Sequence, residues 1–200
     1  MQIFKYLLFL TTLLFSKSQT IILEKDKYIP LIGSIDEEVA NEFIKKTSEI
    51  AHSTKDLMIY INSPGGSVTE GEKIINQIEF YKKNDYKINC IALNAFSMAF
   101  YVFQSCDTRY ITNISKLMSH KMILSMLGIQ LQNLLNYLDM VKKIDDRLTN
   151  MVCNKINMPV SEYTAKQYND WWIYGDDIIT YRLADTIVYV NLDVTVANSL

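Results

Sequence analysis

The sequence has few of the residues that small folds use as cross-links or metal ligands. Its 200 residues include only three cysteines and two histidines, which are Cys90, Cys106, Cys153, His52 and His120. These numbers are too small for a disulfide scaffold or a Cys/His zinc module, and we expect neither a metal nor a cofactor. We expect the three cysteines to be buried free thiols.

The sequence also lacks an excess of charge of one sign. It has 20 Lys and Arg against 22 Asp and Glu, a net charge of −2. No basic surplus is available to hold a phosphate backbone, so nucleic acid is excluded as the main partner. The 49% of hydrophobic and 21% of charged residues are typical of a globular chain, and the length predicts one domain with its own core.

Residues 1–18 have the pattern of an export signal. Lys5 supplies a positive charge, residues 6–15 are largely apolar, and Ser16 and Ser18 have the spacing that a signal peptidase reads. This apolar run is too short to span a bilayer, which takes about 20 residues. We expect residues 1–18 to be a cleaved signal peptide, or alternatively an uncleaved anchor that holds the protein at a membrane through residues 6–15. Residues 19–200 then form the mature domain, on a secretory route (secreted, lumenal or periplasmic) rather than in the cytoplasm.

Strand-like and helix-like segments alternate along the rest of the chain. Apolar runs predict strands at 28–32, 57–61, 88–93, 110–118 and 187–196, and apolar spacing predicts helices that begin at Asp36 and Ser67. This alternation is typical of an α/β fold with mainly parallel strands. From Ile129 to Ile156 apolar residues recur every three or four positions without Gly or Pro. This pattern predicts one long helix that projects from the body or packs on another subunit.

Two turns between a strand and a helix carry candidate chemistry. Paired glycines in Asn62-Ser63-Pro64-Gly65-Gly66-Ser67 let the backbone approach a ligand, although a purely structural turn is the commoner reason for such a pair. Ser97 opens an apolar helix, where it is either a nucleophile or an N-cap. His120 follows a strand and is the candidate base, whereas His52 lies in a polar stretch typical of the surface. The residues alone leave these alternatives open.

Taken together, residues 57–67, 90–98 and 109–120 resemble the proteolytic subunit of the Clp protease, peptidase family S14. The matching pieces are Ile59-Tyr60-Ile61-Asn62-Ser63-Pro64-Gly65-Gly66, Ser97-Met98 and the run from Arg109 to His120, and the similarity covers nearly all of residues 26–190. The resemblance implies a Clp/crotonase-type α/β fold, a spiral of ββα units with a long projecting helix. It also implies a serine endopeptidase that acts on peptides or unfolded proteins and assembles into homo- or hetero-oligomeric rings.

The resemblance also assigns roles to individual residues. Ser97 would be the nucleophile, His120 the general base, and Asp170 the acid that orients the imidazole and stabilises its cation. The backbone N–H groups of Gly66 and Met98 would form the oxyanion hole.

The chain departs from the family pattern next to these residues. Phe96 and Ala99 replace smaller residues, which predicts a narrower substrate pocket. After His120, Lys121-Met122-Ile123-Leu124 stands where the family has Gln-Pro and a glycine-rich strand that clamps the peptide. The N-terminal loops that gate the pore in the family also look shortened, which puts both ring assembly and the docking of an ATPase chaperone partner in doubt.

Two other functions stay open at this point. One is an exported protease similar to the signal-peptide peptidases, which would use a serine with a lysine base, for which Lys116 and Lys121 flank His120. The other is a non-catalytic, Clp-like subunit of a mixed ring. The presence of Ser97, His120 and Asp170 together favours the enzyme.

Overall fold

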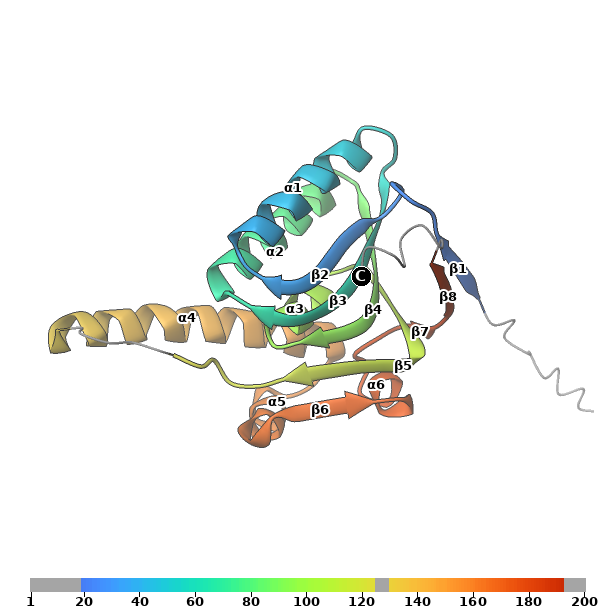
Figure 1. Cartoon of the computed structure of the whole chain (residues 1–200). Coiled ribbons are helices and arrows are strands. Elements are labelled where there is room, and N and C mark those ends of the chain that lie inside the picture. Colours follow the sequence, from blue (N-terminus) through green and yellow to red (C-terminus); the bar gives the residue numbers. More distant parts are fainter. Residues whose placement is uncertain (1–18, 125–129, 193–200) are drawn as a thin grey trace, which may run out of the picture.

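A parallel-dominated sheet forms the centre of the computed structural model, which describes residues 19–124 and 130–192 (Figure 1). The strands are β1 Thr20–Leu23, β2 Ile29–Ile35, β3 Asp56–Gly66, β4 Lys87–Phe96, β5 Thr108–Ser119, β6 Trp171–Tyr174, β7 Thr186–Ile187 and β8 Tyr189–Leu192. The helices are α1 Glu37–Ala51, α2 Val68–Lys83, α3 Met98–Gln104, α4 Leu131–Ile156, α5 Val160–Lys166 and α6 Asp176–Thr180, with a short 3₁₀ helix η1 at Gln167–Asn169. This order confirms the α/β class.

The main sheet has the order β2-β3-β4-β5-β6, and β7 pairs with β5 beside β6. All pairs are parallel except β5 with β6. Because β3, β4 and β5 are parallel neighbours, the residues that follow them meet at one edge of the sheet. The candidate site residues Gly66, Ser97 and His120 all lie at this edge.

The strands agree with the apolar runs, with one difference at the Ser-Pro-Gly-Gly motif. The sequence predicts that the strand breaks at Asn62, but β3 continues to Gly66 and pairs there with Ile35 of β2. A shift in register after Ile32 accommodates the motif. The turn itself begins at Ser67.

Side-chain caps start the first two helices where the sequence predicts. The Asp36 side chain accepts a hydrogen bond from the backbone N–H of Val39 at 2.9 Å, and the Ser67 hydroxyl accepts one from Glu70 at 3.3 Å. Each cap satisfies an N–H group that has no partner inside its helix. α1, α2 and α3 then bury their apolar faces against the sheet in one large core.

A second, smaller sheet pairs the two ends of the described chain, since β1 lies parallel to β8. The sequence analysis identified no strand at residues 20–23. Leu23 of β1 packs in a small cluster with Tyr28, Tyr60 and Ile91, separate from the main core. The predicted strand 187–196 is divided between β7 and β8, and its last residues lie outside the described part, as does the predicted signal, residues 1–18.

Helix α4 projects from the body, as the sequence predicts (Figure 1). Its C-terminal half is anchored by buried apolar residues such as Leu148, Val152 and Ile156. Its N-terminal half exposes Leu135, Leu138 and Met140. None of the helices among residues 19–124 and 130–192 is long and apolar enough to cross a membrane.

The expectation of three free thiols is wrong for two of them. Cys90 of β4 and Cys106, two residues after α3, form a buried disulfide with Cα atoms 6.0 Å apart, and only Cys153 is a free, buried thiol. The pairing depends on how α3 folds back on β4. That fold-back cannot be read from the spacing of the cysteines in the sequence.

Candidate active site

The turn from β4 to α3 presents Ser97 in a strained backbone conformation. Its φ and ψ are 52° and −121°, a region that non-glycine residues rarely occupy, and its side chain makes no capping hydrogen bond to α3. The backbone N–H of Ser97 donates to the carbonyl of Met118 on β5 at 2.9 Å, which holds the turn against the neighbouring strand. A serine on a sharp, strained strand-to-helix turn is typical of a nucleophile.

His120 faces this serine from the end of β5. Phe96 pairs with Met118 across the two strands, so the residues just beyond them, Ser97 and His120, are brought together. His120 Nε2 lies 2.8 Å from Ser97 Oγ, a hydrogen-bond distance. This is the contact that a serine nucleophile needs with its general base.

The turn from β3 to α2 packs directly against the Ser97 turn. A Cβ atom at Gly65, where φ is 92°, would lie 2.5 Å from the Phe96 carbonyl oxygen and 2.7 Å from Ser97 Cβ. Only glycine allows this close approach. The buried hydroxyl of Ser63 fixes the turn, because it donates to the Gly33 carbonyl at 2.6 Å and accepts from the Gly65 N–H at 3.1 Å.

A cavity of about 240 Å³ opens where these turns meet. Gly66 and Met98, the predicted oxyanion-hole residues, both line it with Ser97 and His120. The Met98 N–H belongs to the first residue of α3 and has no partner inside the helix. The remaining lining is mostly apolar and comes from Val68, Tyr101, Met122, Ile123 and Leu148.

Phe96 and Ala99, which were predicted to narrow the substrate pocket, do not line this cavity. The Phe96 ring packs edge-on against Trp172, with centroids 5.1 Å apart, and Ala99 is buried in the core. Both side chains therefore lie away from the lining of the cavity. Met122 and Ile123, from the segment after His120, form part of its wall instead.

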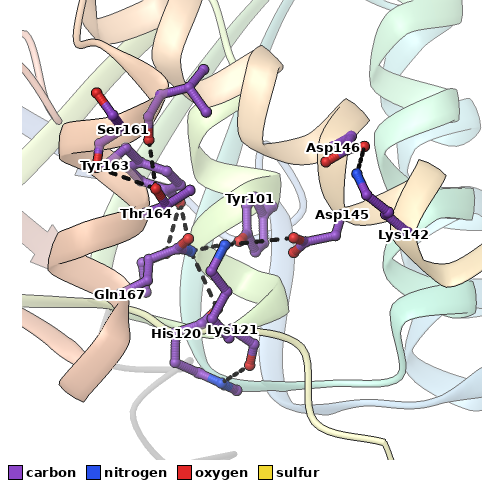
Figure 2. A network of polar contacts seen from close by, with 12 residues as sticks. Tyr101, His120, Lys121, Lys142, Asp145, Asp146, Ser161, Tyr163, Thr164 and Gln167 are labelled. Atoms are coloured by element: carbon purple, nitrogen blue, oxygen red, sulfur yellow. Dashed lines mark hydrogen bonds and ion pairs between the residues drawn. The ribbon is translucent and has the colours of Figure 1, made fainter. Parts of the chain in front are cut away.

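Behind His120 lies a buried polar network that the sequence analysis missed (Figure 2). Gln167 is 1% exposed, and its Nε2 lies within hydrogen-bond distance of the hydroxyls of Tyr101, Ser119 and Tyr163 and of the His120 carbonyl. Burial raises the pKa of Tyr101 and that of Tyr163, so both hydroxyls are protonated at neutral pH. No motif marks these residues, because they meet from three distant segments of the chain.

The structure does not bring Asp170 to His120. Asp170 is exposed, directly follows η1 with a φ of 51°, and has no hydrogen bond or ion pair to His120 in the described part of the chain. His120 Nδ1 faces the carbonyl oxygen of Lys121 at 2.6 Å instead (Figure 2). The role of Asp170 as the acid therefore stays a prediction without a supporting contact.

The two lysines that flank His120 are not placed as bases for Ser97. Lys121 Nζ lies 3.6 Å from a carboxylate oxygen of Asp145 on α4, and Lys116 is exposed on β5. A general base must lie within hydrogen-bond reach of the proton that it removes, and the contact given for Lys121 Nζ is with Asp145. His120 is the titratable group in contact with Ser97.

A comparison with known protein families agrees with this geometry. The family model described as Clp protease matches residues 16–191, which include every strand from β1 to β7 and every residue that lines the cavity. The chain belongs to the Clp protease family.

Proposed function

We propose that this protein is a serine endopeptidase that hydrolyses peptides or unfolded proteins with Ser97 as nucleophile and His120 as general base. Membership of the Clp protease family indicates a peptidase. The observation that carries the finer proposal is the 2.8 Å contact between Ser97 Oγ and His120 Nε2, two residues that line a mostly apolar cavity.

The geometry supports the ordinary sequence of acyl transfer. Ser97 Oγ attacks the scissile carbonyl carbon while its proton passes to His120 Nε2, and the imidazolium then protonates the leaving amine. Water hydrolyses the acyl-enzyme with the same base. The N–H groups of Gly66 and Met98 would stabilise the oxyanion, where removal of one donor costs about 3–4 kcal/mol in a known protease.

Ring assembly is part of this proposal. Members of the family generally form oligomeric rings that act on peptides or proteins. Exposed apolar residues on the projecting half of α4, among them Leu135 and Leu138, support such assembly here. We also propose a secretory location, which the Cys90–Cys106 disulfide supports because disulfides persist in oxidising compartments.

The test is labelling with a fluorophosphonate probe, followed by hydrolysis of a fluorogenic peptide. We expect the wild type to be labelled and Ser97→Ala and His120→Ala to lose labelling, with a fall in kcat of about 10⁶-fold for the serine variant. Ser67→Ala and His52→Ala are matched controls that keep both activities.

Two results would contradict the proposal. Labelling that survives His120→Ala but needs Ser97 would indicate a lysine base. No labelling of folded, oligomeric wild type would favour a non-catalytic ring subunit.

A further inference from the structure

Helix α2 contains a glycine that its own conformation does not require. Gly71 is buried near the start of this helix, and its backbone N–H donates to the Ser67 carbonyl at 3.0 Å, as in any helix. Its φ is not positive, so another residue could adopt the same backbone conformation. Glycine is among the least favourable residues inside a helix, because it loses the most backbone entropy on folding. The reason for Gly71 must therefore lie outside α2.

The Met98 side chain occupies the space that a side chain at Gly71 would need. A Cβ atom at Gly71 would collide with Met98 Cγ, and it would lie 2.6 Å from Met98 Cε and 2.9 Å from Met98 Sδ. Because Cγ is only two bonds from Cα, a movement of the end of the thioether does not relieve the collision. Met98 is 2% exposed and belongs to the main core, so the whole side chain has no open space into which to turn.

A push on the Met98 side chain would reach the backbone beside the nucleophile. Met98 is the first residue of α3, a helix of seven residues, and it directly follows Ser97 with its φ of 52°. The Met98 N–H has no partner inside the helix, so no helical hydrogen bond fixes its direction. Contact of the Met98 side chain with α2 is therefore what holds the Ser97–Met98 peptide from this side.

We propose that Gly71 is a positioning residue of the active site, whose bare backbone lets the Met98 side chain lie against α2 and so aims the Met98 N–H at the oxyanion. This inference rests on the proposed function and adds to it a residue that does not line the cavity. An oxyanion donor works only at hydrogen-bond distance from the developing charge, and a misplacement of about 1 Å costs about 10²-fold in rate.

The first experiment is a double-mutant cycle of Gly71→Ala and Met98→Ala, measured by hydrolysis of a fluorogenic peptide. We expect Gly71→Ala to lower kcat by about 10²-fold with KM within about 3-fold of wild type, as for a misplaced donor. Met98→Ala keeps the N–H and removes the collision, so the double variant should lie within about 5-fold of Met98→Ala alone. Asn76→Ala, at an exposed position of the same helix, is the matched control and should leave kcat unchanged.

Two results of this cycle would overturn the proposal. One is full activity in folded Gly71→Ala, and the other is a loss that Met98→Ala does not reverse, since Gly71 would then act through a different neighbour. If Gly71→Ala does not fold, the double variant should fold, because the collision is with the Met98 side chain. A double variant that also fails to fold would overturn the proposal as well.

A second experiment does not depend on activity. Selective ¹⁵N-methionine labelling reports on the backbone amides of the methionines, and the Met98 signal is the one that Met98→Ala removes. We expect Gly71→Ala to move this signal and Asn76→Ala to leave it in place, and an unmoved signal in Gly71→Ala would overturn the proposal. A moved signal in a protein without Ser97-dependent hydrolysis would support the positioning of the Met98 N–H and reject the peptidase function. The two proposals can therefore fail separately.

Discussion

The molecule contains two strand-to-helix turns that end in a serine, and they use it in opposite ways. Ser67, after β3, has a φ of −58° and caps α2 with its hydroxyl. Ser97, after β4, has a φ of 52° and leaves α3 without a side-chain cap. The same residue type in the same topological place is thus structural in one turn and directed toward His120 in the other.

The difference comes from what surrounds each turn. The first turn is satisfied within itself and by β2, through Ser63, Gly33 and the Ser67 N–H that donates to the Ile35 carbonyl at 2.8 Å. The second is held by β5 and by contact with the glycines of the first turn. The Ser97 hydroxyl is available for chemistry because contacts with neighbouring segments hold its strained backbone conformation in place, so the side chain is not needed as a helix cap.

A side chain at Gly65 would disrupt the close contact between the turn that follows β3 and the turn that carries Ser97. We expect Gly65→Ala to abolish peptide hydrolysis and to lower the free energy of unfolding by about 3 kcal/mol, from left-handed backbone strain and from overpacking against Phe96 and Ser97. Urea denaturation and peptide hydrolysis measure the two effects.

Gly33→Ala is the matched control for this substitution. Its φ of 79° imposes the same kind of strain, but nothing lies within 4 Å of the added Cβ. We expect a stability loss of about 1 kcal/mol with retained activity. Equal loss of activity in both variants would show that strain, and not the contact between the turns, supports Ser97.

The Cys90–Cys106 disulfide is a further difference between the two turns, because it cross-links the segment that contains the Ser97 turn but not the segment that contains the Ser67 turn. Cys90 and Cys106 span 16 residues that include Ser97. A loop of this length stabilises a fold by about 3 kcal/mol, so we expect the Cys90→Ala/Cys106→Ala double variant to lose about that much. In the unreduced, denatured wild type we expect one titratable thiol, Cys153, and three titratable thiols would contradict the pairing.

Much of the fold could be predicted from the sequence, because it depends on local patterns. Apolar runs end at turn residues, Asp36 and Ser67 mark helix starts, and the long apolar period predicts α4. Strands β1 and β6 were not identified. β1 is short, and β6 is recognisable only by its pairing with β5.

Some residues of the candidate site could likewise be predicted from the sequence, and others could not. Gly66, Ser97, Met98 and His120 lie at or just after the ends of three neighbouring strands, so order along the chain and a family resemblance were enough to propose them together. Gln167 could not be proposed, since a buried glutamine in a polar stretch has no sequence signature. Asp170 was placed by alignment to Pro159 and Trp172, and such an alignment contains no information on which way a carboxylate points.

The smallest effect that we expect is on the free energy of unfolding when the serine of each turn is replaced, and it has opposite signs in the two turns. Ser67→Ala removes a helix cap and should lower the free energy of unfolding by about 1 kcal/mol while hydrolysis continues. Ser97→Gly removes no cap and relieves a positive φ, so it should raise the free energy of unfolding by about 1 kcal/mol while hydrolysis is lost. Urea denaturation of the two variants beside wild type decides the matter: if Ser97→Gly is destabilised like Ser67→Ala, the Ser97 backbone is not strained, and the two serines differ only in their neighbours.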